Sequence, residues 1–215
     1  MSIVPSRLAS SLRGGLGPLA RGLHALGISA NTVTVLGLVL TVAGAALLAT
    51  AQPTAALVLL LLGTLCDTLD GQLARAAGGG TRFGSFLDST LDRLSDAALA
   101  IAAVYLGASI FDPRSPLPTG ATAYVLFWSG VMLLVGSFLV SYIRAKAESL
   151  GETASMGLAP REARIAIYLI GVAAWAMTGS VQLFTAAVAV AAFLATVTVI
   201  QRIAHMASAL NKKKG

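Results

Sequence analysis

Cysteine, histidine and charged side chains are all scarce in this chain of 215 residues. The single cysteine, Cys66, excludes an intramolecular disulfide and a cysteine-based zinc site. The two histidines, His24 and His205, lie near opposite ends of the sequence and do not suggest a shared metal site. Carboxylate oxygens are therefore the metal ligands that remain available.

Charged residues make up 11% of the chain and hydrophobic residues 56%, whereas an ordinary soluble domain carries about 25% charged residues. This composition predicts an integral membrane protein. Each helical crossing of the bilayer needs about 20 apolar residues, so the chain has room for about six crossings. The net charge of +6 is attributed to contacts with anionic lipid headgroups, and no nucleic-acid partner is expected.

Apolar runs separated by turn-forming or charged residues predict an all-α fold with six membrane-spanning helices. In residues 6–26, leucines recur at spacings of three and four between Arg7, Arg13 and Arg21, which predicts an amphipathic helix in the membrane interface; a mobile tail is the alternative. We therefore expect an interfacial helix and linker in 1–30, a six-helix domain in 31–208 and a basic tail in 209–215. The predicted spans are 33–50, 54–74, 84–111, 121–147, 162–177 and 181–206.

Lysine and arginine gather ahead of the first span, between the second and third, between the fourth and fifth, and at the C-terminus. The connections on the other side of the membrane contain a single basic residue, Arg114. By the positive-inside rule, both termini and the two basic loops are expected in the cytoplasm, which requires an even number of spans. The predicted location is the cell membrane, with the functional site at its cytoplasmic face.

Asp67 and Asp70 on the second span, and Asp88 and Asp92 on the third, are spaced so that each pair shares one helix face. Two facing helices would join them in one acidic pocket. Each carboxylate near the bilayer costs about 2.5 to 3.5 kcal/mol, and clustered like charges repel one another. Two divalent cations, Mg²⁺ or alternatively Mn²⁺, would compensate them and polarise a bound phosphate. Buried salt bridges to nearby arginines are the alternative.

The residues around these aspartates suit a phosphate ligand. Gly71 would let a phosphate or nucleotide approach the helix backbone, and the glycines at 78–80 would let the following loop wrap over it. Arg75 and Arg82 would pair with phosphate oxygens.

The pattern Asp-x2-Asp-Gly-x2-Ala-Arg-x8-Gly-x3-Asp-x3-Asp runs from Asp67 to Asp92. It resembles the signature of the CDP-alcohol phosphotransferases at every fixed position. The resemblance implies a six-helix membrane enzyme, a homodimer among its relatives, that transfers a phosphatidyl group from a CDP-linked lipid to an alcohol and releases CMP. It also implies that Asp67, Asp70 and Asp88 bind metal and that Asp92 both binds metal and acts as the catalytic base.

Three further stretches, at 78–84, 141–148 and 201–202, are similar to the phosphatidylinositol phosphate synthases of actinobacteria, whose substrates are CDP-diacylglycerol and inositol 1-phosphate. This chain carries Asn31 where many relatives carry aspartate. The similarity implies that the CDP-lipid contacts Asn31, Thr32, Val33, Thr34, Gly71, Arg75 and Thr81.

The acceptor substrate also requires basic residues in its binding pocket. Inositol 1-phosphate is a dianion, so its pocket needs fixed cations beside the metal site. Lipid-headgroup anchoring is the other interpretation of the same basic residues. Two further hypotheses are transfer to glycerol 3-phosphate and, in a different functional class, cation transport, since intramembrane carboxylates also mark ion pathways. The candidate acceptor residues are Ser141, Arg144, Lys146, Arg161, Arg164 and Arg202.

Overall fold

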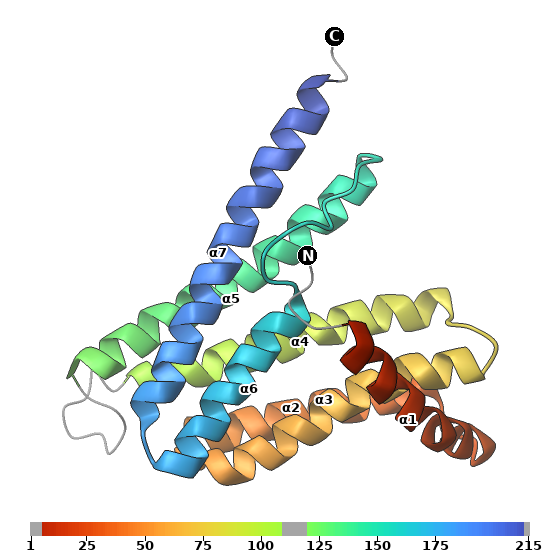
Figure 1. Cartoon of the computed structure of the whole chain (residues 1–215), viewed down its shortest axis with the longest axis horizontal. Coiled ribbons are helices and arrows are strands. Elements are labelled where there is room, and N and C mark those ends of the chain that lie inside the picture. Colours follow the sequence, from red (N-terminus) through yellow and green to blue (C-terminus); the bar gives the residue numbers. More distant parts are fainter. Residues whose placement is uncertain (1–5, 109–119, 213–215) are drawn as a thin grey trace. The chain divides into compact units, whose positions relative to one another are not determined.

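The structure is a computed structural model that describes residues 6–108 and 120–212 (Figure 1). Within these residues the chain is all helical, as predicted. Arg114, the end of the third predicted span and the last residues of the basic tail lie outside them. The helices are α1 (Ser6–Ala25), α2 (Ala30–Ala49), α3 (Pro53–Ala76), α4 (Arg82–Gly107), α5 (Gly120–Ser149), α6 (Arg161–Thr178) and α7 (Val181–Lys212).

Each predicted span coincides with one helix, and most ends agree within a few residues. The C-terminus differs, because α7 continues to Lys212 although the span was predicted to end at 206. Alanine and leucine in this stretch are strong helix formers, and lysines at a helix C-terminus interact favourably with its dipole. Residues 209–212 of the predicted tail therefore extend the last helix.

Four of the described helices are long and apolar enough to cross a membrane: α2, α3, α5 and α7. Two predicted spans do not meet that standard in the described residues. The helix α6 has only 18 residues and begins with Arg161, Glu162 and Arg164, while α4 carries five charged side chains. Length and composition therefore support an all-α membrane protein with four such helices. The charged residues of α4 are Arg82, Asp88, Asp92, Arg93 and Asp96.

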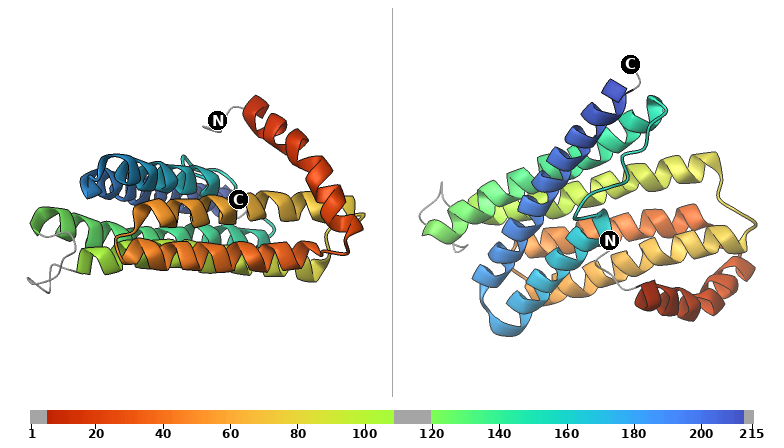
Figure 2. Two further views of the ribbon diagram at one scale, coloured as in Figure 1. Left: turned by 90° about the horizontal axis from the view of Figure 1, so that it is seen from below. Right: turned by 45° about the horizontal axis from the view of Figure 1, so that its top comes forward.

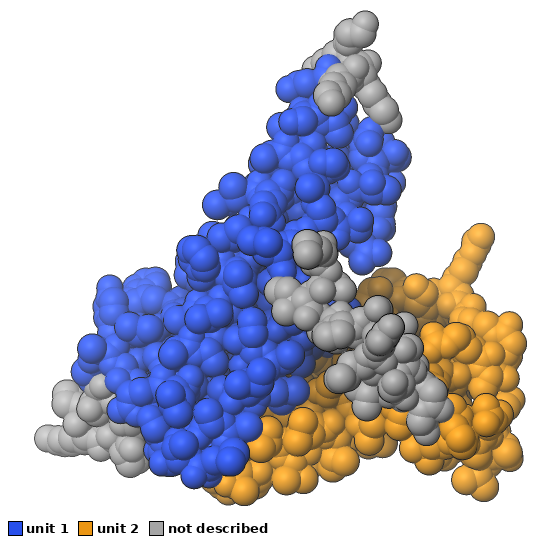
Figure 3. Space-filling model, viewed as in Figure 1, with its two compact units in different colours: residues 1, 100–215 blue, residues 2–99 orange. Residues whose placement is uncertain are grey.

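The chain divides into two compact units, residues 2–99 and residues 1 and 100–215 (Figure 3). The division falls inside α4. In the unit 2–99, α2 and α3 pack side by side (Figure 2). Glycines let the two helices approach closely: a Cβ atom on Gly44 would lie 2.9 Å from the Leu60 side chain, and one on Gly63 would lie 2.5 Å from Thr41 Oγ1. Small residues serve this purpose where helices associate in lipid.

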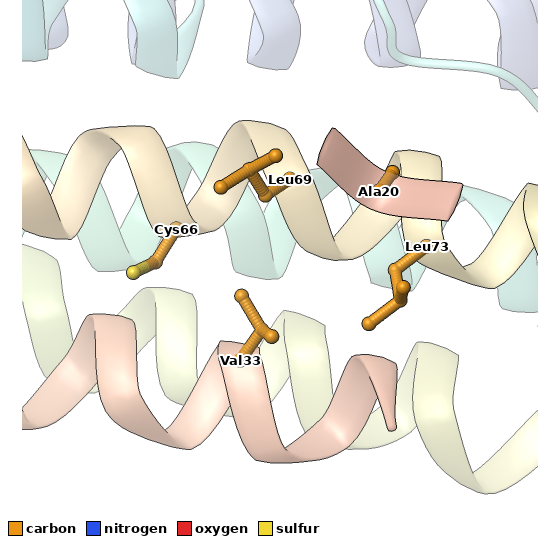
Figure 4. Packing of buried hydrophobic residues seen from close by; sticks show 5 residues of the cluster. All are labelled: Ala20, Val33, Cys66, Leu69 and Leu73. Atoms are coloured by element: carbon orange, nitrogen blue, oxygen red, sulfur yellow. The ribbon is translucent and has the colours of Figure 1, made fainter. Parts of the chain in front are cut away.

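Helix α1 packs on the same unit through its C-terminal half. Ala20 is 1% exposed and lies beside Leu69 and Leu73 of α3, and Val33 of α2 completes the cluster from the other side (Figure 4). Helix α1 is therefore docked against α3 around Ala20. Its outer surface exposes Leu19.

In the unit containing residues 100–215, α7 packs against both α5 and α6. Tyr168 and Trp175 of α6 enclose Phe184 of α7, with ring centroids 5.1 and 5.7 Å from the Phe184 ring. The last turns of α4 lie against α5, where Gly107 leaves no room for a side chain next to the Phe127 backbone. This packing fixes α7 as the central helix of its unit.

Candidate active site

A cavity of about 630 Å³ lies within the unit 2–99. Its wall is formed by the turn between α1 and α2, the start of α2, the second half of α3, the glycine loop and the start of α4. Three of the four predicted metal ligands and four of the predicted CDP-lipid contacts come together here. They are Asp67, Asp70 and Asp88, with Asn31, Thr34, Gly71 and Thr81.

The starts of α2 and α4 meet closely at the edge of this cavity. Thr81 Oγ1 accepts the Gly84 N–H at 2.9 Å, the bond of a helix N-cap. A Cβ atom on Gly84 would lie 3.1 Å from Thr81 Oγ1 and 3.2 Å from Asn31 Oδ1. Gly84 therefore lets the polar side chains of Asn31 and Thr81 share one end of the cavity.

The glycine loop after α3 places its backbone along the cavity. Gly78 and Gly79 have φ angles of +91° and +123°, in the region that glycine adopts readily. Their N–H groups bond to the Arg75 and Ala74 carbonyls, which ends α3. Because Gly79 and Gly80 both line the cavity, the loop borders the site as the glycine run predicted.

Three predicted CDP-lipid contacts do not line the cavity. Val33 is 6% exposed and packs in the hydrophobic cluster between α2 and α3. The Thr32 hydroxyl is 2.9 Å from the Ser29 hydroxyl at the N-cap of α2. Arg75 is exposed, with Nη1 3.7 Å from the position that a Gly71 Cβ would take, so it lies beside the cavity wall.

The aspartates offer the oxygen ligands that hard divalent cations prefer. Asp70 is 7% exposed, and its Oδ2 atom has no hydrogen-bond partner among the described residues. A buried carboxylate oxygen left in this way is costly without a cation. Asp67 and Asp88 line the same cavity. The donor set therefore fits a divalent metal ion.

The carboxylates are nevertheless not gathered into a finished coordination sphere. Within 6–108 and 120–212, no group of three or more histidine, cysteine, aspartate or glutamate side chains has metal-binding geometry. Like charges repel, and carboxylates without a cation between them separate. Closing this set around an ion would need movements of the aspartate side chains.

Asp92 lies one helical turn after Asp88 but does not line the cavity. Its side chain is 22% exposed, and its Oδ2 atom is 3.5 Å from Arg93 Nη2. Asp92 therefore forms an ion pair with a neighbouring arginine, as the salt-bridge alternative proposed for these aspartates.

The predicted acceptor residues all belong to the other unit. On α5, the Ser141 hydroxyl donates to the Ser137 carbonyl at 3.1 Å, and Arg144 pairs with Glu148 at 3.0 Å in an exposed position. Lys146 is exposed and Arg161, the first residue of α6, is half-buried. None of these side chains is locked in the core.

Arg164 and Arg202 are instead buried and bonded to backbone carbonyls. Arg164 Nη1 donates to Ala159 O at 2.9 Å. Arg202 donates from Nε to Met156 O at 2.9 Å and from Nη1 to Val140 O at 2.6 Å. The structure thus gives both buried arginines a contact with the loop before α6, Arg202 at Met156 and Arg164 at Ala159.

Sequence reasoning assigned no role to three residues that the structure places at these sites, His24, Thr198 and Gln201. His24 lines the aspartate cavity, although its isolation in the sequence suggested no role. Thr198 and Gln201 bond to the loop before α6, 39 and 43 residues away in sequence. A single sequence holds no signal for contacts of that separation.

The sequence model of the CDP-alcohol phosphatidyltransferase family matches residues 27–207. This chain belongs to that family. Archaetidylinositol phosphate synthase of Pyrococcus horikoshii is 33% identical over 202 residues, which cover 92% of this chain and 94% of the relative. Phosphatidylinositol phosphate synthase of Mycobacterium marinum is 39% identical over 157 residues, which cover 72% of this chain and 62% of the relative.

Solved structures give the same relationship. The crystal structure of Mycobacterium tuberculosis phosphatidylinositol phosphate synthase with CDP-DAG bound superposes with a TM-score of 0.75 at 32% identity, covering 87% of this chain and 90% of that one. The same enzyme in complex with manganese and citrate gives a TM-score of 0.75 at 31% identity, with 86% of each chain covered. The family is one of transferases that use a divalent metal, so the cation-transporter hypothesis has no support.

Proposed function

We propose that this chain transfers the phosphatidyl group of CDP-diacylglycerol to inositol 1-phosphate, giving phosphatidylinositol phosphate and CMP. The cavity that joins Asp67, Asp70 and Asp88 to Asn31, Thr34 and the glycine loop carries this proposal. The archaeal and mycobacterial relatives differ in the lipid part of their names and agree in inositol phosphate. That agreement supports inositol 1-phosphate as the acceptor.

On the nucleotide side, the cavity would hold the CMP part and the pyrophosphate of the CDP-lipid. Asp67, Asp70 and Asp88, with Asp92, would hold two Mg²⁺ ions, or Mn²⁺ in their place. When bound, the ions supply positive charge that neutralises the pyrophosphate and polarises its phosphorus–oxygen bonds. Asn31, Thr34 and Thr81 offer hydrogen bonds to the nucleotide, and Gly79 and Gly80 keep the neighbouring wall free of side chains.

Asp92 is the proposed base. Its partly exposed carboxylate accepts the proton of one acceptor hydroxyl, and that hydroxyl oxygen attacks the lipid-side phosphorus. The new phosphorus–oxygen bond forms as the bond to the CMP oxygen breaks, and CMP leaves with the electron pair. Asp92 lies one helical turn from Asp88, so the proposed base and a cavity-lining aspartate lie on the same helix.

The acceptor phosphate would be bound by the polar and basic side chains predicted for it. Ser141, Arg144, Lys146 and Arg161 keep exposed or half-exposed side chains for this task. Arg164 and Arg202 would add charge from buried positions. A guanidinium has five N–H donors, so Arg202 retains donors beyond its bonds to Met156 and Val140.

In the membrane, we propose six crossings, with α4 and α6 added to the four apolar helices because each carries its charges toward its N-terminal end. The basic loops and both termini would then face the cytoplasm of the cell membrane. Helix α1 would lie in the interface with Leu19 toward lipid. A homodimer, as implied by resemblance to the family, is part of the same proposal.

One assay tests the function. Purified protein in lipid nanodiscs is incubated with labelled CDP-diacylglycerol, Mg²⁺ and either inositol 1-phosphate, inositol, glycerol 3-phosphate or serine. We expect lipid product and CMP only with inositol 1-phosphate, and none from an Asp70→Asn control. Product with glycerol 3-phosphate instead would identify a phosphatidylglycerol phosphate synthase, and lack of product with every acceptor would contradict the proposal.

A further inference from the structure

The segment between α5 and α6 is bound to α7 by two side chains that accept its backbone N–H groups. Gln201 Oε1 accepts the Leu158 N–H at 3.1 Å. Thr198 Oγ1 accepts the Ala159 N–H at 3.3 Å. Residues 158 and 159 belong to no helix, so these amides depend on side chains for their hydrogen bonds.

Two arginines hold the carbonyl groups of the same short segment. Arg202 Nε donates to Met156 O, and Arg164 Nη1 donates to Ala159 O, both at 2.9 Å. Side chains from α6 and α7 thus fix donors and acceptors of the backbone between Met156 and Ala159. A loop held in this way has a defined position relative to α7.

Packing reinforces the hydrogen bonds. Thr198 and Ala159 are both 0% exposed. Gly157 has a φ angle of +146° and lies so close to the Thr198 methyl group that a side chain there would collide with it. The Thr198 hydroxyl donates its own proton to Leu194 O at 2.8 Å, which leaves its lone pairs to the Ala159 N–H. Thr198 therefore contacts the segment with both its hydroxyl group and its methyl group.

This contact lies directly before the start of α6. Pro160 is the N-cap residue and Arg161 the first residue of the helix. The position of Ala159 therefore determines where α6 begins and, with it, where Arg161 and Arg164 lie. Phosphate bonds to arginine are short, and a displacement of about 1 Å in a binding group can cost two orders of magnitude in rate.

We propose that Thr198 and Gln201 are positioning residues of the acceptor site, which fix the segment 156–159 against α7 and thereby place Arg161 and Arg164 for the acceptor phosphate. This inference rests on the proposed function, but it holds for any phosphorylated alcohol bound by these arginines. Thr198 and Gln201 act through the backbone and touch no reacting atom.

Thr198→Val and Gln201→Met test the inference because each keeps the size of the side chain and removes the acceptor of one amide. Gln201→Glu keeps an acceptor oxygen and serves as the conservative variant. Thr196→Val is the matched control: Thr196 lies on the same helix, is half-buried, and its hydroxyl donates to Ala192 O at 3.0 Å. It makes the same kind of local bond without meeting the segment before α6.

We expect Thr198→Val to raise the acceptor KM about tenfold, the effect of losing one buried hydrogen bond, and Gln201→Met to raise it less because its bond is exposed. The KM for the CDP-lipid should stay within about twofold, Thr196→Val should resemble the wild-type enzyme, and Gln201→Glu should keep the wild-type hydrogen exchange of the segment 156–159. Hydrogen exchange followed by mass spectrometry should show faster exchange at residues 156–159 in the first two variants alone. Equal increases in both KM values, or faster exchange with an unchanged acceptor KM, would overturn the inference.

The two proposals fail differently. The acceptor KM is measured for whichever phosphorylated alcohol the wild-type protein uses. If that is glycerol 3-phosphate, the proposed function is wrong, while a selective rise in its KM still supports the positioning role. If inositol 1-phosphate is used and no variant changes its KM or the exchange rate, the function stands and the positioning role is wrong.

Discussion

Gly37 of α2 faces Asp67 of α3 so closely that a Cβ atom on Gly37 would lie 3.2 Å from Asp67 Oδ1 and 3.0 Å from Cys66 Cβ. The distance between the two helices at a proposed metal ligand therefore depends on the absence of a side chain. Contacts this short require a neighbour to move, and packed helices resist such movement.

Gly37→Ala should weaken metal binding through Asp67. We expect the Mg²⁺ concentration for half-maximal activity to rise about tenfold, within the range seen when residues that support metal ligands are changed. Gly44→Ala is the matched control, because its Cβ would press on Leu60 at 2.9 Å, two helical turns from Gly37. Both variants should lower the melting temperature. An equal change of metal dependence in both would show that Gly37 acts only on stability.

Asp70→Asn should separate stability from activity. Removing the charge from a buried carboxylate whose Oδ2 has no partner in the described residues should leave the melting temperature in EDTA unchanged or higher. Mg²⁺ should raise the melting temperature of the wild-type protein, since a ligand that binds the folded state stabilises it, and should not do so for the variant. Turnover should fall at least about 100-fold. A variant with the wild-type response to Mg²⁺ would exclude Asp70 as a ligand.

Asp92→Asn should abolish turnover and leave CDP-lipid binding partly intact. Asp92 does not line the cavity, so its loss should change the nucleotide wall little, while an amide cannot accept the proton of the attacking hydroxyl. Binding of CDP-diacylglycerol by isothermal titration, together with single-turnover release of CMP, measures the two effects. Residual activity within about tenfold of the wild-type enzyme would mean that another group is the base.

The helices could be predicted from the sequence because apolar runs and turn residues act locally. The acidic cavity could be predicted as well, since the spacing of Asp67, Asp70 and Asp88 places them on helix faces and membrane burial of carboxylates demands a reason. At the start of α2, however, the resemblance to the family grouped Val33 with Thr34 as CDP-lipid contacts. The rotation of α2 turns Val33 into the hydrophobic cluster and Thr34 into the cavity. Helix rotation depends on tertiary contacts that a local pattern does not contain.

The acceptor side shows the same limit. An acceptor dianion needs fixed cations, and this predicted a binding role for Arg202. It did not predict that the partners include the Met156 and Val140 carbonyls, because backbone groups carry no sequence signal. Likewise, Gln201 lies in a stretch that is similar to the phosphatidylinositol phosphate synthases, whereas its bond to the Leu158 N–H follows only from the folded loop.

Phe184→Ala should be among the most destabilising changes in α7. The ring is 0% exposed and packs against Tyr168 and Trp175. Truncating such a core residue costs about 3 to 5 kcal/mol in free energy of unfolding. Phe193→Ala on the same helix is the control, because Phe193 is 67% exposed. Removing its ring would take away contact with lipid and would leave no cavity inside the protein. Since lipid tails are as apolar as a protein core, the difference between the variants isolates packing from simple transfer out of water. Denaturant unfolding in detergent micelles measures it, and equal losses from both variants would mean that the aromatic cluster adds nothing to the stability of α6 against α7.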